Sequence, residues 1–209
     1  MTHNVESRLA EVYHSASQSD LSKTYDDWAA NYDADMQSLG YAHPAVIVGI
    51  VSRYIAELNT PILDAGVGTG TIGMLLNILG FSNLHGIDMS KGMLARAAQR
   101  KIYSNLTQAT LGQALDFQSQ SFGAIVSTGT FTSGHAPASA FDELSRILRT
   151  DGWMIFTVAE TVWQTQGFAE KLKSLTQLKL RWQTEPYHPM PFSKTEGALL
   201  TRAYVYQKV

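Results

Sequence analysis

The sequence contains no cysteine, so disulfide bridges, a cysteine nucleophile, cysteine-bound zinc and iron–sulfur clusters are excluded. It also has little net charge, because 16 Lys and Arg against 18 Asp and Glu give a formal charge of −2. A near-neutral chain has no overall electrostatic attraction for nucleic acid or for an anionic membrane surface. We therefore expect neither nucleic acid nor a membrane among the partners.

Long apolar runs and clustered metal ligands are also missing. The longest apolar stretch, Ala45–Val51, is too short to cross a bilayer. The N-terminal residues lack the apolar core of a secretory signal, which predicts a cytoplasmic protein. The six histidines are scattered without HxH or HExxH spacing, so no metal site is expected.

A length of 209 residues with 44% hydrophobic content favours one folded domain, 1–209. Short apolar runs predict strands, and apolar positions at helical spacing predict helices. The expected strands are 62–63, 84–87, 106–111, 122–127, 153–158, 178–183 and 200–208, and the expected helices after residue 43 are 44–58, 71–79, 90–101, 138–149 and 167–178. This alternation predicts an α/β fold: a Rossmann-like, doubly wound, mostly parallel sheet with helices on both faces. The last two strands have no helix between them, which predicts an antiparallel pair at the sheet edge.

Residues 1–43 differ from this core, 44–209, because they carry helical patterns only. Leu9, Val12 and Tyr13 have helical spacing. Tyr25, Trp28 and Tyr32 also fall on one helical face, so 25–36 is expected to form a single amphipathic helix.

A glycine-rich turn follows the first expected strand. Gly66, Gly68 and Gly70 stand between that strand and a helix, where bare backbone N–H groups can approach an anionic ligand. Asp88 ends the next strand, where a carboxylate accepts hydrogen bonds from both hydroxyls of a ribose. The order of strand, glycine turn, helix, strand and acid predicts binding of a nucleoside cofactor.

The nature of the nucleoside is open at this point, because residues 68–73 (GTGTIG) also match the dinucleotide fingerprint G-x-G-x-x-G. An NAD-dependent oxidoreductase is therefore one alternative. Against it, Asp64 lies at the entry to the loop, where a dinucleotide-binding strand is usually apolar. An NAD-dependent enzyme also needs a second mononucleotide-binding half and a substrate domain, for which this chain is short.

Several segments resemble class I S-adenosylmethionine-dependent methyltransferases. The resemblance lies in 63–70 (LDAGVGTG), 85–90 (HGIDMS), 122–131 (FGAIVSTGTF) and 144–152 (LSRILRTDG). The segment 25–33 (YDDWAANYD) is similar to methyltransferase-like proteins of the Williams–Beuren region type. The resemblance implies a seven-stranded sheet with a reversed last strand, S-adenosylmethionine as cofactor and S-adenosylhomocysteine as product.

The resemblance also implies roles for individual residues. Asp64 would hold the amino group of the cofactor, Asp88 the ribose and Met89 one side of the adenine. The aromatic residues of 25–32 would form a lid over the cofactor. Where relatives commonly carry Ala-Asp-Leu beside the adenine, this chain has Thr110 and no carboxylate. The complete set of implied cofactor residues is Tyr25, Trp28, Tyr32, Asp64, Gly66, Gly68, Thr69, Gly70, Asp88, Met89, Thr110, Leu111, Ser127 and Thr128.

For such an enzyme we expect methyl transfer to a small-molecule acceptor by direct in-line displacement, since an activated methyl group requires no nucleophile on the protein. The candidate general bases are His135, in the loop after the fourth strand, and Glu160, just after the fifth. A non-catalytic S-adenosylmethionine-binding module is a second alternative. The expected assembly is a monomer or a homodimer.

Overall fold

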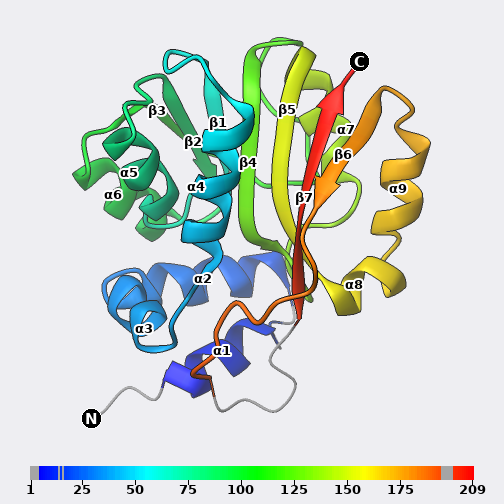
Figure 1. The fold of residues 1–209 in the computed structure, drawn as a ribbon. Coiled ribbons are helices and arrows are strands. Elements are labelled where there is room, and N and C mark those ends of the chain that lie inside the picture. The colour runs from blue at the N-terminus through cyan, green and yellow to red at the C-terminus, as the bar shows by residue number, and fades with distance from the viewer. Residues whose placement is uncertain (1–4, 14, 16, 194–199) are drawn as a thin grey trace.

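The computed structural model describes residues 5–13, 15, 17–193 and 200–209. Within them, one seven-stranded sheet has the order β3-β2-β1-β4-β5-β7-β6 (Figure 1). The strands are β1 (Ile62–Ala65), β2 (Leu84–Asp88), β3 (Tyr103–Gln108), β4 (Phe122–Phe131), β5 (Leu148–Ala159), β6 (Leu178–Gln183) and β7 (Thr201–Lys208). β7 is antiparallel to both β5 and β6, whereas β1 to β5 pair in parallel. The α/β fold and the antiparallel terminal pair are therefore confirmed.

Helices cover both faces of this sheet (Figure 1). The helices are α1 (Val5–Tyr13), α2 (Gln18–Trp28), α3 (Tyr32–Ser38), α4 (His43–Tyr54), α5 (Thr71–Ile78), α6 (Lys91–Gln99), α7 (Ala140–Ile147), α8 (Glu160–Thr165) and α9 (Phe168–Ser174). α4 and α5 pack on one face of the sheet, and α7 to α9 pack on the other. All four residues of β1 are buried, because a central parallel strand covered on both faces is apolar on both sides. No described helix is long and apolar enough to cross a membrane.

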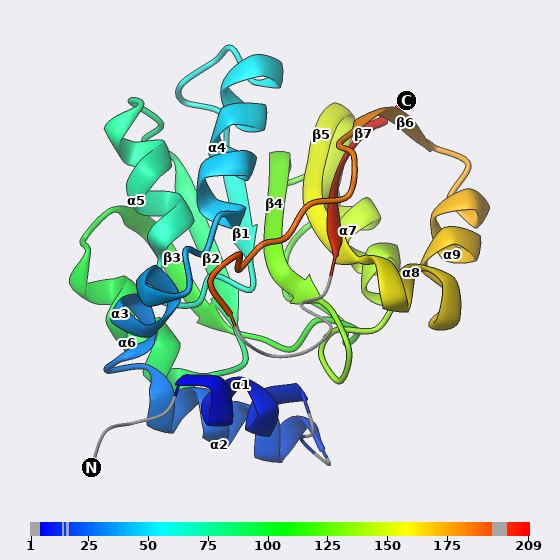
Figure 2. The ribbon, with the colours of Figure 1, turned by 60° about the horizontal axis from the view of Figure 1, so that its bottom comes forward.

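The N-terminal helices α1 to α3 lie below the sheet in Figure 1, and Figure 2 shows α1 and α2 side by side. They share a small core that includes Leu9, Leu21, Trp28 and Met36. The expected single helix over 25–36 is wrong, because α2 ends at Trp28 and α3 begins at Tyr32. Even so, the rings of Trp28 and Tyr32 remain in edge contact, with centroids 4.9 Å apart.

Other element boundaries also differ from those expected. α4 ends at Tyr54, short of residue 58, and α8 has no counterpart among the predicted helices. α7 ends at Ile147, because Leu148 already pairs with Phe122 as the first residue of β5. β4 continues beyond Ser127 through a break in its pairing with β5. Periodicity could not reveal the end of α7 or the extension of β4, since both depend on strand pairing across the sheet.

Candidate cofactor and active site

A cavity lies at the point where the strand order reverses, between β1 and its neighbour β4. Ligands of open α/β sheets bind at such switch points, beyond the carboxyl ends of the strands. Loops after β1, β2, β3 and β4 line it from the sheet side, and α2 lines it from the opposite side. The predicted residues among its lining are Tyr25, Tyr32, Gly66, Gly68, Asp88, Met89, Thr110, Leu111, Thr128 and His135. We call this cavity the cofactor pocket.

The glycine turn forms one wall of the cofactor pocket with bare backbone. Gly66 and Gly68 have φ angles of +84° and +53°, a region that glycine adopts without steric cost. A Cβ atom at Gly66 would lie 2.6 Å from Oγ1 of Thr130, so a side chain does not fit there. A Cβ atom at Gly68 would meet no atom within 4 Å, because this residue faces the open pocket. The turn is thus a cradle with room for a ligand.

Asp88 closes the same wall from the tip of β2. Its Oδ2 accepts a hydrogen bond from the Gly68 N–H at 2.8 Å, and its Oδ1 accepts one from the Ser90 N–H at 2.9 Å. Burial raises the pKa of Asp88, while the backbone hydrogen bonds oppose the rise. These bonds fix the orientation of the carboxylate and leave lone pairs for a diol.

Asp64 lies beneath the pocket and is not part of its lining. The Tyr103 hydroxyl donates to its Oδ2 at 2.8 Å, and the Gly73 N–H donates to that hydroxyl at 3.2 Å. Burial raises the pKa of Asp64 to about 7. Gly73 leaves space for the tyrosine, since a Cβ atom at Gly73 would lie 2.2 Å from the Tyr103 hydroxyl.

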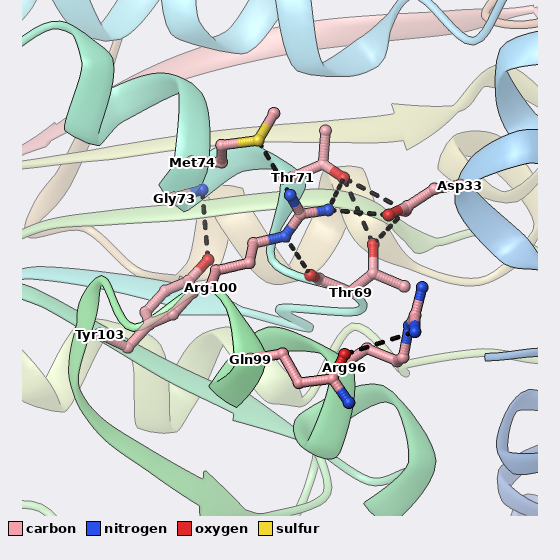
Figure 3. A network of polar contacts seen from close by, with 9 residues as sticks. All are labelled: Asp33, Thr69, Thr71, Gly73, Met74, Arg96, Gln99, Arg100 and Tyr103. Atoms are coloured by element: carbon pink, nitrogen blue, oxygen red, sulfur yellow. Dashed lines mark hydrogen bonds and ion pairs between the residues drawn. The ribbon is translucent and has the colours of Figure 1, made fainter. Parts of the chain in front are cut away.

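Four other predicted residues support the cofactor pocket from outside its lining. Trp28 donates its Nε1–H to Asp35 at 2.7 Å. Gly70 caps α5 with a φ of +82°. The Ser127 hydroxyl donates to the Ala65 carbonyl at 2.6 Å, which ties β4 to β1. The Thr69 hydroxyl donates to Asp33 on α3 (Figure 3).

The two candidate bases lie in different surroundings. His135 lines the cofactor pocket, whereas Glu160 lies outside that lining and accepts a hydrogen bond from Arg202 Nε at 2.8 Å. His135 Nδ1 lies 2.8 Å from the Ser133 carbonyl, so Nδ1 carries the proton. His135 Nε2 then accepts a hydrogen bond from the Tyr25 hydroxyl, 2.8 Å away. Burial lowers the pKa of His135, which keeps the ring neutral.

The sequence did not single out several residues that line the cofactor pocket. Gln18 and Leu21 come from α2, and Met93 comes from α6. Gly129 and Thr130 come from the extended end of β4, where Gly129 has a φ of +65° and breaks the strand pairing. In the sequence, only the glycine within the strand segment STGTF indicated that the pairing of β4 is interrupted there.

A second cavity adjoins the cofactor pocket, and we call it the aromatic chamber. The two cavities share Tyr25, Tyr32, Gly129 and His135. The chamber volume is about 50 Å³. One water needs roughly 10–15 Å³ on this measure, so the chamber has room for a group of several non-hydrogen atoms.

Comparison with known proteins agrees with this geometry. Residues 63–156 match the protein-family profile described as Methyltransferase domain. Human methyltransferase-like protein 27 is 36% identical over 123 residues, which cover 57% of this chain and 50% of that protein. The match over residues 63–156 therefore indicates a methyltransferase domain, and the fold is the one found in S-adenosylmethionine-dependent methyltransferases. The chain spans about half the length, or less, of the curated relatives it matches.

Solved structures show the same fold as this methyltransferase domain. A TehB-like S-adenosylmethionine-dependent methyltransferase from Corynebacterium glutamicum has a TM-score of 0.63 at 23% identity, over 87% of this chain and 98% of that one. The [4+2]-cyclase SpnF has a TM-score of 0.65 at 14% identity, over 79% and 80% of the two chains. Because one of these folds belongs to a cyclase, the reaction must be argued from the site.

The cofactor pocket of the domain fits S-adenosylmethionine. The Asp88 carboxylate offers acceptors for the two ribose hydroxyls, and the bare turn at Gly68 leaves space for the amino acid portion. Apolar side chains of Met89, Met93 and Leu111 line the pocket, which suits a planar base.

Proposed function

We propose that this protein transfers the methyl group of S-adenosylmethionine to a small-molecule acceptor by direct in-line displacement. The observation that carries the proposal is the pairing of Asp88 with the Gly68 N–H beside an open cradle. Support for a small acceptor comes from the adjoining aromatic chamber, which the N-terminal helices cover. We propose that the chain acts in the cytoplasm as a monomer or homodimer, without nucleic acid or a membrane as partner.

The sulfonium of the bound cofactor supplies an activated methyl group, so the residues of the chain orient the reactants and exclude water. We propose that Asp88 binds the ribose hydroxyls of the cofactor. The turn at Gly66 and Gly68 accommodates its amino acid portion. Tyr25 and Tyr32 on the N-terminal helices close the site from the side opposite the glycine turn. They also line the chamber, so they bound the path between cofactor and acceptor.

We assign the role of general base to His135 and no catalytic role to Glu160. The neutral Nε2 of His135 accepts a hydrogen bond from the hydroxyl of Tyr25, a residue that lines both cavities. A proton lost by the acceptor would pass to the Tyr25 oxygen as the Tyr25 proton moves to Nε2. Glu160 is held by Arg202, away from both cavities.

The test is isothermal titration of the purified protein with S-adenosylhomocysteine, S-adenosylmethionine and NAD. We expect both adenosyl amino acids to bind and NAD not to bind. Asp88→Asn removes the charge of a carboxylate that we assign to the ribose hydroxyls, so we expect about 10- to 100-fold weaker binding. The matched control is Asp116→Asn, the same change at an exposed residue outside the pocket lining.

Two experimental results would contradict the proposed function. Binding of NAD in preference to S-adenosylhomocysteine would favour the oxidoreductase alternative. Tight binding of S-adenosylmethionine without methyl transfer to any of a broad panel of acceptors would favour a non-catalytic binding module. The fold of the cyclase neighbour shows that this scaffold also serves other reactions, so turnover must be followed by mass spectrometry of the methylated product.

A further inference from the structure

The aromatic chamber contains a buried hydroxyl without a hydrogen-bond partner. Thr132 follows β4 and is 8% exposed, and its Oγ1 has no partner among the residues that the structure describes. Thr132 lines the chamber with its other atoms, and rotation about its Cα–Cβ bond would turn this oxygen toward a molecule bound there. Native proteins rarely leave a buried polar atom unpaired. The free hydroxyl therefore indicates a ligand group that completes its hydrogen bonding.

The described walls of the chamber carry no formal charge. None of the described residues that line it is Asp, Glu, Lys or Arg. Its two histidines, His43 and His135, are neutral, because burial lowers both pKa values, that of His43 to about 3. Its tyrosines are neutral as well, because burial raises their pKa values. An ammonium or carboxylate on the acceptor would lose its hydration there without gaining a counter-ion.

The same walls present aromatic rings to the occupant. Tyr25 and Tyr32 lie in edge contact with centroids 6.3 Å apart, and Tyr41 and His43 lie in edge contact at 5.1 Å. Aromatic side chains pack favourably against another ring in offset or edge-to-face geometry. The chamber therefore favours a flat, apolar body over a flexible polar one.

The base beside the chamber limits which hydroxyl can react. Tyr25 and His135 offer a neutral imidazole as the final proton acceptor. Such a weak base is matched to an aryl hydroxyl, whose pKa resembles the value of about 10 for free tyrosine. An unactivated O–H with a pKa near that of water, about 15.7, is far less suited to it.

We infer, on the basis of the proposed function, that the acceptor is an uncharged aryl hydroxyl compound whose second polar group binds Thr132. The aryl oxygen attacks the methyl carbon, and the carbon–sulfur bond breaks with its electron pair going to sulfur. The aryl O–H proton passes to the Tyr25 oxygen, and the Tyr25 proton passes to His135 Nε2. The products are a methyl aryl ether, S-adenosylhomocysteine and one proton on His135, which is later released to water.

Four phenols test this inference with the full chain and S-adenosylmethionine. 4-(Hydroxymethyl)phenol is uncharged with a second polar group, and p-cresol is uncharged without one. Tyramine carries a positive charge and 4-hydroxyphenylacetate a negative charge. We expect kcat/KM for 4-(hydroxymethyl)phenol to exceed that of each charged phenol by at least about 10-fold.

Thr132→Val tests the anchor, because valine keeps the shape of threonine and lacks its hydroxyl. We expect the ratio of KM for 4-(hydroxymethyl)phenol to KM for p-cresol to rise about 5- to 10-fold, because only the first compound loses a hydrogen bond. The control Thr165→Val, at an exposed site on α8, leaves this ratio unchanged. A merely structural role of Thr132 would affect p-cresol and 4-(hydroxymethyl)phenol equally.

The outcomes separate this inference from the proposed function. Faster methylation of a charged phenol, or an equal effect of Thr132→Val on p-cresol, overturns the inference. Binding of S-adenosylhomocysteine without methylation of any of the four phenols also overturns it and leaves the proposed function standing. Failure to bind S-adenosylhomocysteine overturns the proposed function itself.

Discussion

Asp33 on α3 and Arg100, just beyond the end of α6, form an ion pair with 2.8 Å between Oδ2 and Nη2 (Figure 3). The other carboxylate oxygen of Asp33 accepts a hydrogen bond from Thr69 in the glycine turn. Arg100 Nε donates to the Thr69 carbonyl at 2.6 Å. The three residues therefore link the N-terminal layer to the loop that holds the cofactor.

We expect Asp33→Asn to loosen this link without unfolding the protein. The two side chains are 42% and 20% exposed, so solvent weakens the ion pair and the change in stability is under about 1 kcal/mol. Amide exchange in α3, followed by mass spectrometry, should quicken, and S-adenosylhomocysteine should bind about 3- to 10-fold more weakly. Asp27→Asn removes the same charge from an exposed site on α2 and should change neither. If the amide exchange of α3 is unchanged in the Asp33 variant, Asp33 does not hold the N-terminal layer on the glycine turn.

The parts of the site predicted from sequence are those that depend on local geometry. The turn from Gly66 to Gly70 and the acid Asp88 follow from one strand–helix–strand unit, so their spacing was sufficient. Thr132 and Gly129 required knowledge of where β4 loses its pairing with β5. The contact between Asp33 and Arg100 spans 67 residues of chain and leaves no periodic signal. The helical break after Trp28 was missed because the aromatic pattern continues across it.

A buried carboxyl predicts one pH dependence of stability. Burial raises the pKa of Asp64 to about 7, above the unfolded value of about 4. The folded protein thus binds more protons at Asp64 between these values, so the contribution of Asp64 to stability is greatest below pH 4 and falls as pH rises to about 7. Asp64→Asn should remove this loss, which is at most about 4 kcal/mol. Urea unfolding at pH 5 and pH 8 measures the difference.

The control for Asp64 is Asp116→Asn, which removes the charge of an exposed carboxylate. The Asp64 variant should gain stability relative to the parent protein at pH 8 more than at pH 5, whereas the Asp116 variant should follow the parent at both. An Asp64 variant that follows the parent at both pH values would show that Asp64 ionises normally.

A buried histidine predicts the opposite pH dependence. Burial lowers the pKa of His43 to about 3, and its Nδ1 lies 2.7 Å from the Tyr187 hydroxyl. The unfolded chain, with a histidine pKa of about 6.5, binds the extra proton, so stability is lost as pH falls below that value. At pH 5 the loss from His43 is about 2 kcal/mol. His43→Asn keeps a hydrogen-bonding atom near Nδ1 and should remove the loss.

Urea unfolding at pH 7.5 and pH 5 measures this effect. The exposed His188, changed to Asn, serves as the control and should keep the pH dependence of the parent protein. If His43→Asn loses as much stability as the parent between these pH values, the ring is protonated in the folded state and the assignment is wrong.

Tyr25 lines both cavities, and Tyr25→Phe separates its two roles. Phenylalanine keeps the ring that packs on Trp28, with centroids 6.3 Å apart, and removes the hydroxyl that donates to His135. We expect S-adenosylhomocysteine affinity to stay within about 3-fold, because the ring still covers the cofactor pocket. We expect kcat for an aryl hydroxyl acceptor to fall by about 100-fold, because the acceptor proton no longer has a path to Nε2.

Two comparisons decide whether the hydroxyl acts in proton transfer. The control is Tyr32→Phe, which removes the hydroxyl of the other tyrosine that lines both cavities and leaves the hydrogen bond between Tyr25 and His135 in place. It should keep kcat within about 3-fold of the parent value. Raising the pH ionises the aryl hydroxyl in solution, so the Tyr25→Phe defect should shrink toward pH 10, near the acceptor pKa of about 10. A defect of constant size across this range would assign Tyr25 to packing alone, because a lost proton path matters only while the acceptor still carries its proton.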